Sequence, residues 1–267
     1  MAIYDCFQYF NEDHILDLRL NILNKSVDYF VISESTKTHQ GKKKELNFDI
    51  KNFSKFRNKI IYIVADFDGD INFKNHEGGE SIIEKHQRNK LYEGLKNAED
   101  NDLIILSDSD EIPDLNKLNT IKKTTKFTAY SHKMFMYKLN LQNLNESNWI
   151  GSKITQKKNI SSMQNLRDLK FKKYPFWRID KFGLQIVNGG WHFSFLQSPE
   201  LIAEKIKSFS HGEFNKNQFT DIKKIKERIM SGEDIFQRGF ELKKISIDNT
   251  FPNYIVENQA KFSKWIA

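Results

Sequence analysis

Acidic side chains are concentrated in one stretch, residues 102–114, which reads D-L-I-I-L-S-D-S-D-E-I-P-D. Its apolar run, residues 103–106, has no alternation, which is typical of a strand buried on both faces of a parallel sheet. Asp108 and Asp110 follow, and in an extended backbone their side chains leave on the same side. Two such carboxylates repel each other, and a divalent cation relieves that repulsion. The stretch therefore predicts a site for Mg²⁺ or Mn²⁺, with phosphate oxygens as further ligands.

A simpler interpretation of the same residues is an acidic turn after a core strand, because Asp, Ser and Pro are common in turns. Pro113 is expected to end the strand, since proline cannot donate to a strand ladder. The motif D-x-D is short and occurs in many unrelated proteins. The rest of the chain must therefore decide between a metal site and a turn.

Strands alternate with helices along the first half of the chain. We expect strands at 3–10, 27–33, 60–65 and 103–107, and helices at 14–24 (capped by Asp13), 52–58 and 81–98. Residues 66–79, rich in Gly, Asp and Asn, are expected to form a surface loop. Further on we expect a helix at 115–123, a strand at 129–141, and helices at 198–209 and 221–230. The alternation predicts an α/β fold with a parallel sheet and right-handed crossovers.

Ligands of such sheets bind beyond the carboxyl ends of the strands. Four acidic residues fall at those ends and are expected to share one rim: Glu12, Glu34, Asp66 and Asp108. No Pro/Gly/Ser-rich linker marks a boundary, so we expect a single domain over residues 1–267.

Composition excludes several classes of protein. A hydrophobic content of 39% argues against disorder, and the single Cys6 excludes an intrachain disulfide or a thiolate cluster. The formal net charge of +7 favours anionic partners such as nucleotides, lipid head groups or nucleic acid. We see no signal segment and no run long enough to span a bilayer, so we expect a cytoplasmic protein that could touch the inner face of a membrane through its charge. Phosphate-loop, dinucleotide-binding, zinc-protease and hydrolase motifs are missing from the sequence.

Three further places could carry chemistry. Arg88, on the helix before the acidic strand, could clamp phosphate or be an ordinary exposed arginine. His192 follows Gly189 and Gly190, which would let the backbone approach a ligand, and its imidazole could join the metal; it could equally be a hydrogen-bonded core residue. In S-H-G-E-F, His211 and Glu213 could form a cap and turn, or a base and its orienting partner.

Together these segments resemble glycosyltransferase family 17. The resemblance rests on D-C-F-x-x-F-N-E at 5–12, R-L at 19–20, V-D-Y-F-V-I-S-E-S at 27–35 with Thr38 and Gly41 after it, L-S-D-S-D-E-I-P at 106–113, G-W-H-F-S at 190–194 and S-P-E at 198–200. These pieces occur in the order of the family and cover nearly the whole chain. Several motifs in register are far more specific than any one of them.

The resemblance implies a GT-A fold: a Rossmann-like, mostly parallel sheet flanked by helices, with a helical C-terminal part. Residues 1–125 would bind the nucleotide sugar, and residues 126–267 would face the acceptor. It implies inverting, Mn²⁺-assisted transfer, expected to move GlcNAc from UDP-GlcNAc to a glycan or glycolipid hydroxyl with a β linkage. Asp108 and Asp110 become the D-x-D pair that holds the metal against the donor diphosphate, with His192 as a third ligand. Eukaryotic members carry a membrane anchor and a luminal stem, which this chain does not show, so its acceptor is left open.

Inversion requires a carboxylate that takes the proton of the acceptor hydroxyl while the diphosphate leaves from the opposite face. Glu213 is the predicted base, with Glu111 and Asp180 behind it. Glu12 and Glu34 are predicted to bind ribose or uracil, and Arg88 to add a positive contact.

Two alternatives remain open at this stage. A metal-dependent nucleotidyltransferase also joins acidic pairs to a parallel sheet, but it releases pyrophosphate instead of a nucleoside diphosphate. A basic nucleic-acid-binding protein ranks lower, because the lysines are dispersed and no binding module is recognised. No specific nucleic-acid partner is therefore expected.

Overall fold

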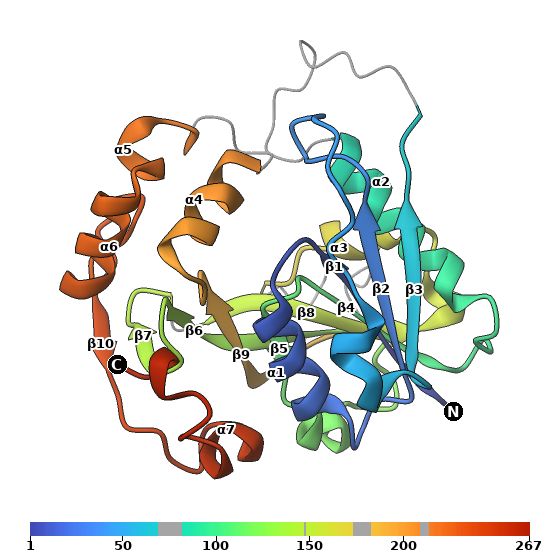
Figure 1. The fold of residues 1–267 in the computed structure, drawn as a ribbon. Helices are drawn as coiled ribbons and strands as arrows, with labels where there is room; N and C mark the ends of the chain where they lie inside the picture. Colours follow the sequence, from blue (N-terminus) through green and yellow to red (C-terminus); the bar gives the residue numbers. More distant parts are fainter. Residues whose placement is uncertain (69–81, 147, 173–182, 209–213) are drawn as a thin grey trace.

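A single sheet connects the two halves of the chain in the computed structural model, which describes residues 1–68, 82–146, 148–172, 183–208 and 214–267 (Figure 1). Its N-terminal half is parallel, and its strands are in the order β3 (Ile60–Ala65), β2 (Tyr29–Ser35), β1 (Ile3–Tyr9) and β4 (Leu103–Ser107). The strands expected at 60–65 and 103–107 have the predicted bounds. With helices on both faces, the expected α/β architecture is confirmed.

The sheet continues with mostly antiparallel strands. Next to β4 lie β8 (Trp149–Gln156), β6 (Phe127–Met136), β7 (Leu141–Asn143) and β10 (Leu242–Lys244), while β9 (Leu184–Ser194) pairs in parallel with β6 and antiparallel with β5 (Glu111–Pro113). The sequence did not reveal β8, because its buried positions include Ser152, Lys153 and Thr155 and so lack an apolar pattern. The strand expected at 129–141 is divided between β6 and β7.

Helices cover the sheet on both faces. On β1, Phe7 packs into the core cluster that contains helix α1 (Asp13–Leu23), and the neighbouring Cys6 packs into the cluster on the opposite face. The other α-helices are α2 (Ile82–Lys90), α3 (Met163–Asp168), α4 (Pro199–Ser208), α5 (Asn217–Thr220), α6 (Ile222–Ser231) and α7 (Asn253–Glu257). The 3₁₀ helices are η1 (Ile50–Phe56), η3 (Leu91–Leu95), η4 (Leu115–Thr120), η5 (Lys157–Asn159) and η8 (Ser263–Trp265). Figure 1 shows α4, α5 and α6 on the opposite side of the molecule from α2.

Several predicted helices differ from the structure in type or extent. The helix expected at 81–98 divides into α2 and η3, and those expected at 52–58 and 115–123 are the 3₁₀ helices η1 and η4. Asp13 is the first residue of α1 and not its cap, a position that Glu12 occupies without a capping hydrogen bond. Within the described ranges, no helix combines the length and the apolar character needed to cross a bilayer.

Residues 108–111, called the acidic turn from here on, lead from β4 into β5, whose first residue is Glu111. The backbone N–H of Glu111 donates to the carbonyl of Asp108 at 3.1 Å, so the chain turns here and is not extended as predicted. Pro113 is the last residue of β5 and is paired with Gly190 of β9. The backbone reverses because β5 joins β9, a long-range pairing that the local sequence does not reveal.

The buried side chain of Arg19 in α1 binds the backbone of the acidic turn. Its Nε and Nη2 donate to the carboxylate of Asp5 at 2.7 and 2.6 Å, and Nη2 also reaches the hydroxyl of Ser107 at 2.9 Å. Its Nη1 donates to the carbonyls of Glu111 at 2.5 Å and Asp108 at 3.2 Å. Both charged side chains are fully buried. One guanidinium therefore connects α1, β1 and the acidic turn.

We expect Arg19→Leu to lower the free energy of unfolding by about 3–5 kcal/mol, because it leaves the Asp5 carboxylate buried without a partner. Adding Asp5→Asn should recover part of that loss, since a neutral amide is less costly to bury. Lys261→Met is the control: it removes an exposed ion pair with Asp17 of α1 and should cost about 1 kcal/mol or less. Urea denaturation measures all of these. A loss below about 1 kcal/mol for Arg19→Leu would contradict the anchoring role.

Candidate functional site

A pocket of about 520 Å³ lies over the carboxyl ends of β1 and β4 and is lined by residues of both halves of the chain. This is the edge at which ligands of open α/β sheets bind. Its walls include Tyr9, Glu12, Asp108, Asp110, His192 and Lys205. The acidic turn therefore projects into a cavity of the size that small-molecule ligands occupy.

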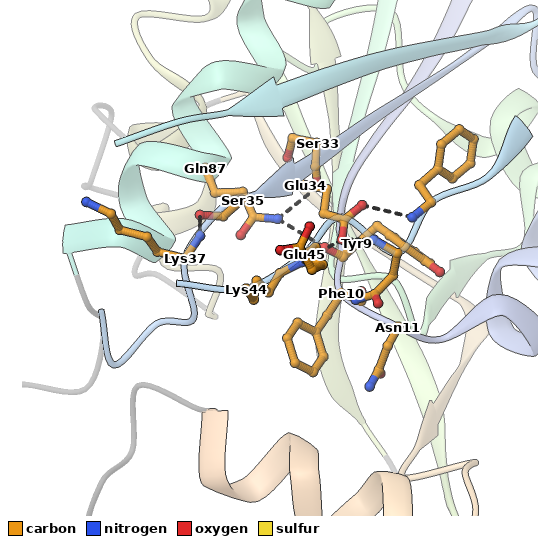
Figure 2. Close-up of polar contacts among 12 residues, drawn as sticks. Tyr9, Phe10, Asn11, Ser33, Glu34, Ser35, Lys37, Lys44, Glu45 and Gln87 are labelled. Carbon is orange, nitrogen blue, oxygen red and sulfur yellow. Dashed lines mark hydrogen bonds and ion pairs between the residues drawn. The ribbon is translucent and has the colours of Figure 1, made fainter. Parts of the chain in front are cut away.

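On the N-terminal side, Gln87 of α2 joins the ends of two strands (Figure 2). Its Nε2 donates to the carbonyl of Tyr9 at 3.2 Å and to that of Ser33 at 2.8 Å. Lys44 lies beside them, with its Nζ 5.4 Å from the centre of the Phe10 ring. These contacts fix the backbone after β1, which forms one wall of the pocket.

Glu34 lies under this wall and does not line the pocket. Its Oε1 accepts from Lys44 Nζ at 2.5 Å and from the backbone N–H of Asn47 at 2.7 Å (Figure 2). Its Oε2 accepts from the backbone N–H of Phe48 at 3.0 Å and from the Tyr62 hydroxyl at 2.9 Å. The side chain is fully buried. In this arrangement Glu34 holds segment 44–48 against β2.

Cationic side chains approach both aspartates of the D-x-D motif. Arg167 Nη2 lies 3.3 Å and Arg88 Nη2 4.0 Å from the carboxylate of Asp108. His192 Nε2 lies 3.6 Å and Lys205 Nζ 3.7 Å from the carboxylate of Asp110. These distances exceed the roughly 2.7–2.9 Å of a close charge-assisted hydrogen bond. The two carboxylates are therefore balanced electrostatically without being tightly held.

The balance shows in the pKa values of the acids. Burial raises the pKa of Asp108, but Arg167 and Arg88 outweigh it and lower the pKa below its ordinary value. Burial likewise raises the pKa of Asp110, but Lys205 and His192 outweigh burial. The pKa of Asp110 is therefore also below its ordinary value. Both aspartates are thus ionised at neutral pH.

The cations respond to the same contacts. Burial would lower the pKa of Lys205, but Glu12, 2.9 Å from its Nζ, and Asp110 raise that pKa above its ordinary value. Burial would also lower the pKa of His192, and Asp110 raises it instead. The Asp110 carboxylate, 3.6 Å from Nε2, therefore favours the protonated imidazole.

Glu111 lies below the pocket floor, in β5 directly opposite His192. Its carboxylate accepts from Trp149 Nε1 at 2.6 Å and from the backbone N–H of Asp108 at 3.3 Å. Burial and the nearby Asp108 charge raise its pKa. With only 2% of its surface exposed, Glu111 supports the acidic turn from inside the protein.

The paired glycines before Trp191 have a packing role. Gly190 has φ +118°, and a Cβ there would lie 2.6 Å from the carbonyl oxygen of Ile112 and from Cδ2 of His132. Gly189 would collide with the side chain of Lys117. Neither glycine lines the pocket, and Gly190 lets β9 pack against β5 and His132. The expectation that these glycines bring backbone close to a ligand stays a prediction.

The structure brings together only part of the predicted site. Glu12, Asp108, Asp110 and His192 line one pocket, whereas Arg88 lies buried behind Asp108 and Asp66 is exposed elsewhere on the rim. The proposed bases Glu213 and Asp180, together with His211, lie outside the described residues. The expected loop at 66–79 lies largely outside them as well.

Sequence reasoning missed two of the cations. Arg167 lies at the end of α3, in a stretch whose polar composition gave no pattern. Lys205 had a detectable signal, because helical spacing places it beside Ile202, Ala203 and Ile206 on the buried side of α4. A lysine at such a position requires a carboxylate partner, although nothing in the sequence names Glu12.

The donor atoms at the acidic turn suit a divalent cation in type. Carboxylate oxygens and an imidazole are ligands of Mn²⁺, and the Asp108 side chain is 37% exposed towards the pocket. Among the described residues, however, no group of three or more His, Cys, Asp or Glu side chains is arranged to hold a metal ion. The donor atoms of Asp108, Asp110 and His192 are of the types that bind a metal. In this structure, however, the two carboxylates face cationic side chains of the protein.

We expect Glu34→Gln to lower the free energy of unfolding by about 1–3 kcal/mol, because an amide has one acceptor oxygen for four donors. Amide hydrogen exchange should accelerate at Asn47 or at Phe48, because these two N–H groups donate to different oxygens of Glu34 and a glutamine keeps only one of them. Glu45→Gln, at the exposed neighbour in the same segment, is the control and should change neither quantity. Unchanged protection of both amides in Glu34→Gln would show that the carboxylate does not hold the segment.

Structural similarity to solved proteins is weak. The chain resembles the 2-C-methyl-D-erythritol 4-phosphate cytidylyltransferase of Francisella tularensis at 7% identity and a TM-score of 0.38, covering 71% of this chain and 91% of that one. It resembles the inositol-1-phosphate CTP transferase of T. maritima at 10% identity and a TM-score of 0.36, covering 85% and 97%. Likenesses at this level carry no argument about function.

Sequence comparison is decisive for the family. No curated protein sequence matches the chain. The model of glycosyltransferase family 17 matches residues 1–263, which is essentially the whole chain and includes every residue of the pocket described above. The chain belongs to glycosyltransferase family 17 and is a glycosyltransferase.

Proposed function

We propose that this glycosyltransferase moves a sugar, GlcNAc from UDP-GlcNAc, to a hydroxyl of a glycan acceptor with inversion at the anomeric carbon. The observation that supports this most is the continuous pocket, which runs from the ends of β1 and β4, past the acidic turn, to residues of the C-terminal half. Such a pocket suits one ligand from each side. We accordingly propose one domain, in which residues 1–125 bind the donor and residues 126–267 face the acceptor.

The nucleotide would lie against the wall formed by residues 8–12 and 37–39. Backbone there is fixed by Gln87, and the Glu12 carboxylate, held by Lys205, is available at the pocket surface for ribose hydroxyls. Because Glu34 is occupied by segment 44–48, we propose that it shapes this wall and does not itself contact ribose or uracil.

The leaving diphosphate requires positive charge beside it. Arg167 and Lys205 line the pocket on either side of the acidic turn, so we propose that their charges lie beside the phosphate oxygens. Arg88, buried behind Asp108, adds positive potential without reaching the pocket. Mn²⁺ held by Asp108 and Asp110, with His192 beside them, would neutralise further charge on the diphosphate when bound.

In the transfer step, the acceptor oxygen bonds to the anomeric carbon as the bond from that carbon to the diphosphate breaks. The acceptor proton passes to a carboxylate, and the nucleoside diphosphate leaves with the bonding electrons. Glu213 remains our proposal for that carboxylate, with Asp180 as the alternative. Glu111 is a weaker candidate, because its oxygens are bonded to Trp149 and the Asp108 amide beneath the pocket.

We expect Asp110→Asn to lower transfer roughly hundred-fold or more while the melting temperature stays within a few degrees. Asp114→Asn is the matched control, because Asp114 follows in the same segment but does not line this pocket. Incubation with UDP-GlcNAc and candidate glycans, followed by nucleotide analysis, should show uridine diphosphate as the released product. In a parallel incubation with UTP and GlcNAc 1-phosphate, release of pyrophosphate would favour a nucleotidyltransferase. Normal transfer in Asp110→Asn would show that the D-x-D pair is not part of the site.

Removal of divalent cations should abolish transfer, because two aspartates and a diphosphate otherwise place negative charges together. We expect activity to fall in excess EDTA and to return on addition of Mn²⁺. Full activity in EDTA would contradict this and would leave neutralisation of the diphosphate to Arg167 and Lys205.

A further inference from the structure

The pocket extends past the acidic turn along a wall of aromatic rings. The Trp149 ring centre lies 4.9 Å from that of His192. On the other side, Lys205 Nζ is 3.7 Å from the Asp110 carboxylate and 5.9 Å from the centre of the Phe195 ring. Aromatic side chains therefore line the pocket directly beside the acidic turn.

Three phenylalanines of this wall pack on one another and all line the pocket. The ring centres of Phe195 and Phe236 are 5.7 Å apart at an interplanar angle of 63°, and those of Phe214 and Phe236 are 4.3 Å apart at 42°. Such edge-to-face and tilted pairs fix the direction in which each ring points. We call Trp149, Phe195, Phe214 and Phe236 the aromatic wall.

Phe195 adopts a backbone conformation that is rare for a bulky residue. Its φ is +52°, in the left-handed region where a Cβ is crowded by the neighbouring carbonyl. It follows the last residue of β9 and precedes α4 by a short turn, in which Gln197 N–H donates to its carbonyl at 2.8 Å. Conformations of this kind persist at binding sites, where the surrounding structure imposes them. Here the conformation places the ring at the pocket.

The far end of the pocket carries little unbalanced charge. Arg238 lines it with its guanidinium 5.1 Å from the Phe236 ring centre, but Nε and Nη2 donate to the Asp234 carboxylate at 2.8 and 2.9 Å. The rest of the described lining beyond His192 and Lys205 is aromatic, Met or Ser. This end therefore favours a neutral ligand over an anionic one.

We propose that the aromatic wall is the acceptor subsite and takes a neutral hexopyranose, whose apolar C–H face stacks on the half-buried Phe236 and whose reacting hydroxyl points to the acidic turn. This inference rests on the proposed function. Hydrogens on carbon in a sugar ring carry partial positive charge, which the negative face of an aromatic ring attracts. The donor and the acceptor share this one pocket of about 520 Å³, so only the reacting sugar of the acceptor enters it.

Saturation-transfer NMR tests the subsite without requiring turnover. The probes are methyl β-D-glucopyranoside, methyl β-D-galactopyranoside and methyl α-D-mannopyranoside, with octyl β-D-glucopyranoside as the probe for a lipid site. We expect at least one methyl glycoside to receive saturation on the protons of one ring face. In Phe236→Leu that signal should fall about three-fold or more, because the leucine keeps an apolar contact and loses the aromatic face.

Phe240→Leu is the matched control. The guanidinium of Arg238 lies 4.1 Å from the centre of the Phe240 ring, but Phe240 does not line the pocket. The signal should therefore stay at the wild-type level. If Phe236→Leu does not fold, Phe214→Leu tests the same wall. Equal signals in wild type and variant, no methyl glycoside bound, or saturation confined to the octyl chain would each overturn the proposal.

Failure of the subsite and failure of the proposed function are distinguishable. Release of uridine diphosphate from UDP-GlcNAc without acceptor reports on the donor site alone. If that release occurs while the methyl glycosides fail to bind, the aromatic wall is not the subsite and the transferase proposal stands.

Discussion

The buried guanidinium of Arg19 is the contact on which the rest of the site depends. It neutralises the buried carboxylate of Asp5 in β1 and donates to the carbonyls of the acidic turn. One side chain therefore both pairs a buried charge and fixes the backbone of that turn. A buried pair of this kind contributes little net stability compared with apolar packing, but either partner alone is strongly destabilising. Its value here is positional, because it places Asp108 and Asp110 at the pocket.

Around that fixed turn, the pocket is organised by balanced charge. Each aspartate has two cationic neighbours, and Lys205 is shared between Asp110 and Glu12. The cations lie 3.3–4.0 Å from the two aspartates, and the Asp108 side chain is 37% exposed, so these interactions are weaker than those of a close, buried ion pair. We propose that a donor diphosphate and its counter-ion replace these partners when they bind. The pocket thus has balanced ion pairs at the acidic turn and an apolar surface, the aromatic wall, beside them.

The sequence predicted the parts of this structure that local pattern controls. Strands β3 and β4 have the predicted bounds because both are unbroken apolar runs, and Asp108 and Asp110 stand out because they follow one of them. It failed where distant residues decide. The acidic turn bends because β5 pairs with β9, and Lys205 is explained by Glu12 and Asp110, which both lie far from it in the sequence. Glu34 was recognised as important, but its four hydrogen-bond donors come from segments that only the fold brings together.

The account is tested most directly by a crystal structure with uridine diphosphate bound. It predicts the base against residues 8–12 and the diphosphate at the acidic turn, with Lys205 or Arg167 within hydrogen-bonding distance of a phosphate oxygen. A nucleotide bound elsewhere on the molecule, with the two aspartates still facing their cationic partners, would contradict it.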